Sequence, residues 1–144
     1  MWRNNSSFRG NSLSSAISAI DIALWDIKGK RLNAPIWDLL GGKVRNKVRA
    51  IAQGVNGKTP DEFAEKVNTL KEKGFTAVKF TPMPSDWPKY TYSKLMDVSA
   101  NIVKAVRNKV GVDFDIAIEI HRNMRPHEAI VFCNEIEKYK PYFV

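Results

Sequence analysis

Apolar residues in the first third of the chain recur at spacings of three and four, which is the periodicity of a helix. The spacing predicts a helix over residues 12–29, with Ser12 or Ser14 as its N-cap and Gly29 as its end. Ile22 and Trp25 extend the apolar surface nearly all round, so we expect this helix to be well buried. A second, short helix is predicted over 35–40, followed by two glycines.

From Lys47 onward, short apolar runs alternate with helical patterns. We predict strands over 48–53, 75–80 and 114–120, and a fourth strand beginning at Pro141. Helices are predicted over 59–73, over 92–108 and from Pro126, the last with these residues facing inward: Ala129, Ile130, Phe132, Cys133 and Ile136. Such a series builds a parallel α/β sheet, and either a doubly wound sheet or a piece of a (β/α)8 barrel fits it.

Composition places the chain among folded globular proteins. Of its 144 residues, 44% are hydrophobic and 26% charged, which argues against disorder. No apolar run is long enough to span a membrane, and residues 1–7 do not resemble a secretory signal. A single cysteine, Cys133, excludes an intramolecular disulfide and a cysteine-based zinc site. We therefore expect a cytoplasmic protein without a membrane partner.

The chain is basic, with 23 Lys and Arg against 15 Asp and Glu, a net charge of +8. A basic chain can bind nucleic acid. Here the basic residues are spread along the sequence, and several lie near the ends of predicted helices, where cations are favoured. We interpret the charge as a solvated surface and expect no nucleic-acid partner; a nucleic-acid-binding module is the weakest alternative.

Candidate chemistry lies at the strand ends, where parallel α/β folds gather their functional groups. The first strand offers Gln53 and Asn56, and the second Lys79, Phe80 and Thr81. The glycines near the first strand lack the spacing of a phosphate-binding loop, so nucleotide binding is not expected.

The third strand carries Glu119 and His121, two residues apart and thus on one face of an extended strand. A carboxylate there can bind Mg²⁺, and a histidine can move protons near neutral pH. The alternative is that both are only polar groups at a strand end. Lys79 is either catalytic or paired with a neighbouring charge, His127 is interpreted as a surface residue, and Cys133 as a small buried hydrophobe.

Several stretches together resemble the mandelate racemase/muconate lactonizing branch of the enolase superfamily. The most specific are Ala23-Leu24-Trp25-Asp26-Ile27-Lys28-Gly29-Lys30 and Leu39-Leu40-Gly41-Gly42-Lys43. Residues 74–80 are similar to its second barrel strand, 118–122 to its third, and 137–143 to the approach to its fourth. The likeness runs from about Ser12 to Val144.

The resemblance implies an α+β capping domain followed by a modified (β/α)8 barrel. On that basis residues 1–42 are the helical end of the capping domain, and residues 43–144 are the first three βα units plus the start of strand 4. Such enzymes hold Mg²⁺ with carboxylates at the ends of strands 3, 4 and 5, and the ion stabilises an enediolate. Glu119 occupies the position of the first ligand, where Asp is commoner.

Two positions select the type of enzyme within this resemblance. Racemases and cycloisomerases carry a K-x-K pair on the second strand, whereas this chain has Lys79-Phe80-Thr81. In aldonate dehydratases a histidine two residues after the first ligand protonates the departing hydroxyl, and His121 stands there. The resemblance thus implies elimination of water from a small sugar acid to give a 2-keto-3-deoxy acid, with Lys79 aiding the substrate carboxylate.

The chain stops at Val144, before the fourth-strand carboxylate that the resemblance requires. We therefore expect the isolated chain not to be a competent enzyme. Several alternatives stay open for the origin of the chain: a gene fragment, a truncated reading, half of a split protein completed by another chain, or a non-catalytic remnant. For the activity, a racemase or epimerase stays open. The resemblance also allows a homo-oligomer.

Overall fold

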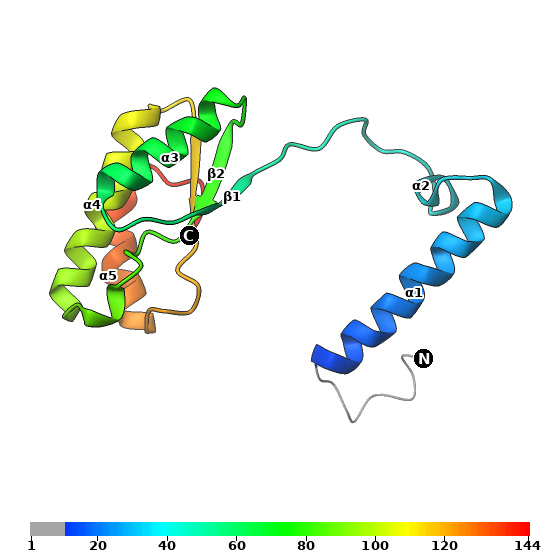
Figure 1. The fold of residues 1–144 in the computed structure, drawn as a ribbon, viewed down its shortest axis with the longest axis horizontal. Helices are drawn as coiled ribbons and strands as arrows, with labels where there is room; N and C mark the ends of the chain where they lie inside the picture. The colour runs from blue at the N-terminus through cyan, green and yellow to red at the C-terminus, as the bar shows by residue number, and fades with distance from the viewer. Residues whose placement is uncertain (1–10) are drawn as a thin grey trace. The chain divides into compact units, whose positions relative to one another are not determined.

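The computed structural model describes residues 11–144 (Figure 1). The chain divides into two compact units, Met1–Val48 and Arg49–Val144. The first contains the helices α1 (Asn11–Leu32) and α2 (Ile36–Leu39). The second contains all the strands found in the described part of the chain.

Helix α1 runs three residues beyond the predicted end at Gly29. Its end is a Schellman motif around Asn33, whose φ is 49°: the Ala34 N–H bonds the Gly29 carbonyl at 3.0 Å, and the Asn33 N–H bonds the Lys30 carbonyl at 3.2 Å. Gly29 serves a different purpose from the predicted one. A Cβ at this position would lie 2.9 Å from the Ala34 carbonyl oxygen, so glycine lets the returning turn approach the helix closely.

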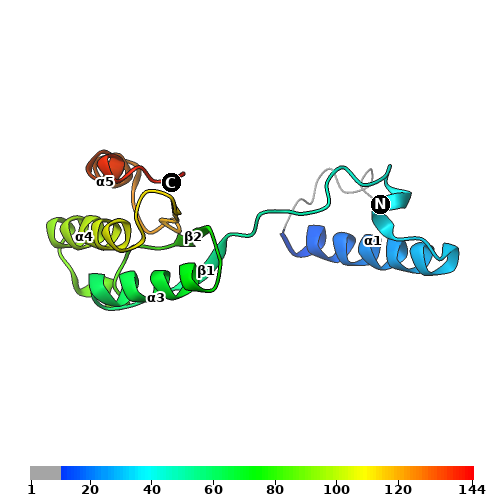
Figure 2. The same ribbon diagram turned by 90° about the horizontal axis from the view of Figure 1, so that it is seen from above.

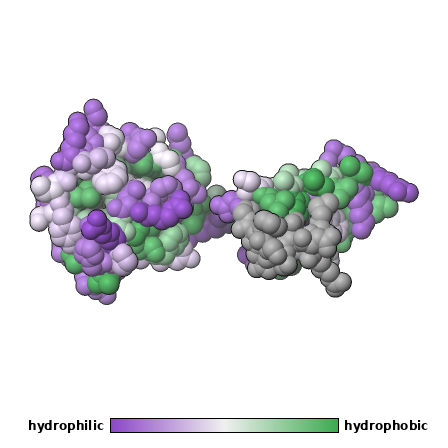
Figure 3. All heavy atoms as spheres, turned by 90° about the horizontal axis from the view of Figure 1, so that it is seen from below, coloured by the Kyte–Doolittle hydropathy of each residue, from purple (hydrophilic) through white to green (hydrophobic). Residues whose placement is uncertain are grey.

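The expectation that this helix is well buried is wrong for the chain as it stands. Only Ile17 and Gly29 of α1 are buried. Four large apolar side chains of α1 are exposed instead: Ile20, Ile22, Leu24 and Ile27. Figure 3 shows apolar residues on the surface of this unit. The physical reason is that, within the first unit, the main helical partner of α1 is the four-residue α2, which is too small to cover an apolar surface on several sides.

The second unit is built on a parallel sheet in the order β1-β2-β3. The strands are β1 (Ala52–Val55), β2 (Ala77–Phe80) and β3 (Asp115–Ile118). Each is shorter than predicted, and β1 begins four residues later because 43–51 carries no strand pairing. Strands β2 and β3 pair in regular register from Ala77↔Asp115 to Phe80↔Ile118.

Three helices follow the strands: α3 (Pro60–Glu72), α4 (Tyr92–Val110) and α5 (Pro126–Ile136). Thr59 caps α3 as expected, its hydroxyl accepting the Glu62 N–H at 3.3 Å. Figures 1 and 2 show all three helices on one side of the sheet. Barrels have this one-sided arrangement, whereas a doubly wound sheet carries helices on both faces, so the structure is that of a partial barrel.

The core of this unit fills the space between the sheet and these helices. Its fully buried large side chains include Phe63 from α3, Ile102 from α4, Phe132 from α5 and Ile116 from β3. The predicted inward position of Ile130 is wrong, because the residue lies on the outer side of α5 and is 62% exposed. Cys133 is half-buried rather than buried.

The predicted fourth strand is only begun. Residues 141–144 are not assigned as a strand, yet the Tyr142 N–H bonds the Ile116 carbonyl at 2.7 Å and the Ile118 N–H bonds the Phe143 carbonyl at 2.9 Å. The chain therefore returns to the free edge of β3. Across 11–144, no helix is long and apolar enough to cross a membrane.

Candidate functional site

Lys79 and Glu119 meet at the carboxyl end of the sheet. Lys79 lies on β2 opposite Ala117 of β3, and Glu119 comes two residues after Ala117. The Glu119 N–H bonds the Phe80 carbonyl at 3.0 Å, which carries the pairing one step past β3. Side chains alternate along a strand, and the neighbours Val78 and Phe80 belong to the core beneath the helices. Lys79 and Glu119 therefore share the face that the helices do not cover.

The two side chains form an ion pair, with Lys79 Nζ 3.2 Å from Glu119 Oε2. The other carboxylate oxygen, Oε1, accepts the backbone N–H of His121 at 2.9 Å. This N–H, followed by the Lys79 ammonium, lowers the pKa of the Glu119 carboxyl below its ordinary value. The side chains are 28% and 39% exposed, so solvent and small ligands can reach the pair.

The prediction that Glu119 and His121 share one face of an extended strand is wrong. Strand β3 ends at Ile118, and His121 and Arg122 have φ values of 49° and 60°, in the left-handed region. The turn lets the His121 N–H point back at the Glu119 carboxylate, and it leaves His121 exposed. The structure thus brings the two residues together through the backbone of His121, not through a strand face.

The other candidates fall in different places. Asn56 follows β1 and is held by Lys66 of α3, whose Nζ donates to the Asn56 carbonyl at 2.5 Å and to Oδ1 at 3.3 Å. Sequence reasoning did not single out Lys66, although a lysine in the helix that follows a strand end could have indicated this contact. His127 lies in the first turn of α5 and is exposed, as interpreted from the sequence.

Mg²⁺ prefers oxygen ligands in an octahedral arrangement. Glu119 offers a carboxylate oxygen, the ligand type that Mg²⁺ prefers. Among residues 11–144, no group of three His, Cys, Asp or Glu side chains is placed to hold an ion. The described residues therefore supply one ligand of a magnesium site and do not complete it.

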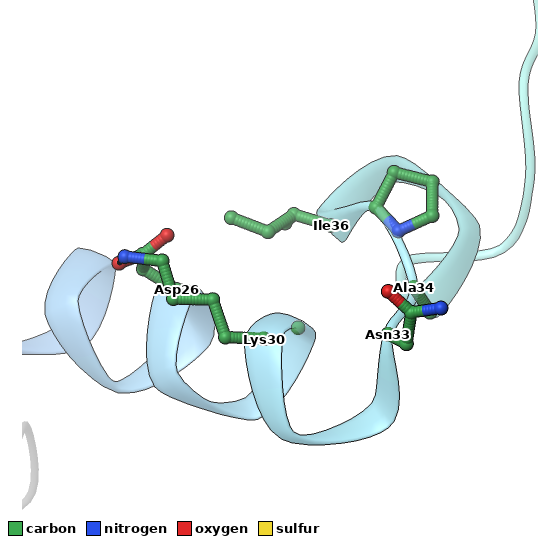
Figure 4. Close-up of a pocket in the computed structure, with 7 residues that line it drawn as sticks. Asp26, Lys30, Asn33, Ala34 and Ile36 are labelled. Carbon is green, nitrogen blue, oxygen red and sulfur yellow. Dashed lines mark hydrogen bonds and ion pairs between the residues drawn. The ribbon is translucent and has the colours of Figure 1, made fainter.

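The first unit has a hollow of its own, of about 440 Å³, where α1 turns into α2. Its lining includes Asp26, Lys30, Asn33 and Ile36. In Figure 4 the Ile36 side chain extends over the hollow, and Lys30 reaches back to Asp26, with which it pairs at 2.6 Å. Asp26 is thus paired with a residue one helical turn away, and the other residues that line the hollow include no second acid, histidine or cysteine.

Comparison with known families covers most of the sequence. Residues 4–41 match the family described as mandelate racemase / muconate lactonizing enzyme, N-terminal domain. Residues 62–144 match the family described as enolase C-terminal domain-like. The second match alone covers more than half of the chain.

Among curated proteins, the chain is 39% identical to a D-gluconate dehydratase of Thermoproteus tenax, over 99% of this chain and 29% of that protein. It is 38% identical to a D-galactonate dehydratase of Klebsiella pneumoniae (strain 342), over 94% of this chain and 35% of that protein. The chain thus spans about a third of the length of the curated relatives it matches.

Solved structures give the same result for the fold. A member of the enolase superfamily from Salmonella Typhimurium superimposes with a TM-score of 0.88 at 29% identity, covering 96% of this chain and 41% of that one. A dehydratase candidate from Zymomonas mobilis ZM4 also reaches 0.88, at 32% identity, over 98% of this chain and 41% of that one.

Proposed function

We propose that this chain, which belongs to the mandelate racemase/muconate lactonizing branch of the enolase superfamily, supplies a metal ligand and a proton donor for the dehydration of a small sugar acid. The reaction is the elimination of water from an aldonate to give a 2-keto-3-deoxy acid. Two relatives with this type of activity in their names support the substrate class. The observation that carries the proposal is the carboxylate of Glu119, presented at the carboxyl end of β3 beside Lys79 and His121.

Glu119 is the proposed ligand of a divalent cation, and the family resemblance implies that this cation is Mg²⁺. When bound, such an ion stabilises the negative charge that develops on a substrate carboxylate as the neighbouring carbon loses its proton. The lowered pKa of Glu119 keeps this side chain ionised, the form in which a carboxylate binds a metal. The backbone N–H of His121 fixes one carboxylate oxygen and so limits the rotation of the group.

His121 is the proposed general acid. The hydroxyl of a sugar acid is a poor leaving group, and a proton delivered to its oxygen allows it to depart as water. The left-handed turn leaves the His121 side chain exposed next to Glu119, at the open end of the sheet. Lys79 is proposed to aid binding of the substrate carboxylate with its ammonium group.

The proposed domain division is a capping segment over 1–42 and a barrel segment over 43–144. The two family matches lie on either side of this division, at 4–41 and 62–144. The compact units meet between Val48 and Arg49, a few residues further along. Residues 43–48, which are exposed, then belong to the start of the barrel segment although they lie in the first compact unit.

The test is a chimera in which this chain replaces the matched segment of the Thermoproteus tenax D-gluconate dehydratase. We expect it to form a 2-keto-3-deoxy acid from D-gluconate or D-galactonate when Mg²⁺ is present. His121→Asn should slow dehydration by about 10²–10⁴-fold, the usual contribution of a general acid, while exchange of the α-proton with solvent persists. The matched control is His127→Asn, on the exposed first turn of α5.

Two results would contradict the proposal. A folded chimera that acts on no aldonate would reject the substrate class. Equal loss of dehydration and α-proton exchange in His121→Asn would reject the role of His121 in leaving-group departure.

A further inference from the structure

We propose that Gln53 is a further binding residue of the site: a β-bulge in β1 turns its side chain onto the helix-free face beside Lys79, where its amide binds the 2-hydroxy carboxylate end of a small acid. This inference rests on the proposed function, which places the substrate carboxylate at Lys79. It adds a residue from β1 to a site that otherwise uses the ends of β2 and β3.

The pairing between β1 and β2 is irregular. The partners at the two ends of the pairing are Ala52↔Val78 and Val55↔Phe80. Two residues of β1, Gln53 and Gly54, therefore stand against one residue of β2, Lys79. Such an insertion is a β-bulge, a feature found often beside active sites because it re-aims a side chain. Gly54 has a φ of 88°, and a Cβ there would meet no atom within 4 Å, so this position needs glycine for its backbone conformation and not for space.

The bulge decides the direction of the Gln53 side chain. In a regular strand, residues three apart lie on opposite faces. Ala52 and Val55 are three apart, yet both are buried in the core beneath the helices. The extra residue corrects the alternation, and Gln53, which follows Ala52, is exposed on the opposite face. Neighbouring strands lie about 4.8 Å apart, so Gln53 and Lys79 are side by side on the helix-free face.

The amide of Gln53 complements the ammonium of Lys79. The ammonium offers donors only, and Glu119 already balances its charge at 3.2 Å. A neutral amide adds two N–H donors and a carbonyl acceptor without adding charge. A 2-hydroxy carboxylate presents the matching acceptor and donor on neighbouring carbons, so one amide can bond both groups. A carboxylate without the hydroxyl leaves the amide carbonyl unused, and Gln53 therefore favours a hydroxy acid over a simple carboxylic acid.

The experiment measures the binding of two small acids to the full chain by NMR. Lactate and propanoate are the probes, because they differ only in the 2-hydroxyl group. The backbone amide of Gly54 reports binding in every variant. An NOE between the side chains of Gln53 and Lys79 in the natural chain checks separately that the two are adjacent.

The variants separate hydrogen bonding from charge. Gln53→Met keeps a side chain of similar length and removes the amide, and Gln53→Glu keeps the acceptor but exchanges the donors for a negative charge. The matched control is Asn108→Leu, which removes an exposed amide from the last turn of α4. Because Gln53 is exposed, we expect the rest of the spectrum to stay unchanged in both of its variants.

We expect the natural chain to bind lactate about two- to tenfold more tightly than propanoate, the gain from one additional hydrogen bond. Gln53→Met should bind the two acids equally, since neither can bond a methionine side chain. Gln53→Glu should bind both acids more weakly, because a second carboxylate repels them. Asn108→Leu should keep the preference of the natural chain for lactate.

Several results would overturn the inference. Equal affinity for the two acids in the natural chain, or no binding of either, would reject a hydroxy-acid site at this bulge. A preference that persists in Gln53→Met would reject the role of Gln53, and its loss in Asn108→Leu would show a general effect of surface substitution. Absence of the NOE would reject the direction assigned to the side chain. The proposed function is tested separately, by aldonate turnover in the chimera with Gln53 in place.

Discussion

Arg107 joins three parts of the second unit through backbone carbonyls. Its guanidinium donates to the carbonyls of Gly111 at 2.6 Å, Phe114 at 2.7 Å, Tyr139 at 2.9 Å and Lys140 at 3.0 Å. These carbonyls belong to the end of α4, the approach to β3 and the segment that returns to the sheet edge. Burial lowers the pKa of Arg107, and the charge of Asp115 opposes that shift. The guanidinium is nevertheless a group that stays protonated in proteins.

Replacing Arg107 with Met keeps much of the stem and removes the donors. The bonds to Phe114 and Tyr139 are partly buried and the other two are exposed. A buried carbonyl left without a donor costs about 1–3 kcal/mol, and an exposed one is satisfied by water. Discounting the two buried carbonyls for their partial exposure, we expect a loss of about 2–4 kcal/mol, a large share of a typical unfolding free energy.

The measurement is native-state amide exchange in the full chain. The amides of Tyr142 and Ile118 bond across the edge of β3, so they report whether the returning segment stays attached. Each 1.4 kcal/mol lost speeds exchange about tenfold. Lys104→Met, an exposed residue on the same helix, is the matched control and should change protection little. A loss below about 1 kcal/mol in Arg107→Met, or unchanged exchange at both amides, would refute the reasoning.

Four further predictions concern single residues. Ser99 is fully buried, and its hydroxyl has no hydrogen-bond partner among residues 11–144. Ser99→Ala should therefore raise the free energy of unfolding by about 0.5–1 kcal/mol in urea denaturation, and a clear loss would reveal a partner. A Cβ at Gly57 would lie 3.1 Å from the Phe63 ring, so Gly57→Ala should lower thermal stability by about 1–3 kcal/mol, and an unchanged midpoint would argue against this contact. Followed by ¹³C NMR, the Glu119 carboxyl should titrate below its ordinary pKa. Because the pKa of this carboxyl is lower in the folded state than in the unfolded state, its ionised form stabilises the folded chain at neutral pH. This contribution disappears as the pH falls through the folded-state pKa. Lys79→Met should raise that pKa only in part, since the larger cause, a backbone N–H, remains; a full return would contradict the assignment.

Much of the local structure was predictable from sequence because its causes lie within a few residues. The Thr59 hydroxyl caps α3 as the sequence indicated, and Gly74, with a φ of 90°, ends the same helix region. The order of the three assigned strands and of the α-helices was likewise correct, since apolar periodicity reports it directly, whereas the predicted fourth strand is not assigned. Gly29 shows where prediction from local sequence fails. In the sequence, a glycine that ends a helix cannot be told from a glycine that lies inside one, and here the position of the Ala34 carbonyl explains why glycine lies inside.

Burial in the first unit could not be predicted in the same way. The apolar pattern of α1 correctly indicates side chains suited to a covered surface, but periodicity does not say what covers them. Only Ile17 and Gly29 of this helix are buried in the structure. Burial depends on residues distant in sequence, so it is a property of the assembled fold and not of the segment.

At the candidate site, the sequence alone determined which groups are present at the strand ends: an ammonium at 79, a carboxylate at 119 and an imidazole at 121. The tertiary structure decided how they meet. Strand register, which no local pattern encodes, sets Lys79 against Glu119, and the left-handed turn at His121 turns its N–H onto the carboxylate. The identity of each residue sets the chemistry of its side chain, whereas the distances between residues on different strands are set only when the sheet has formed.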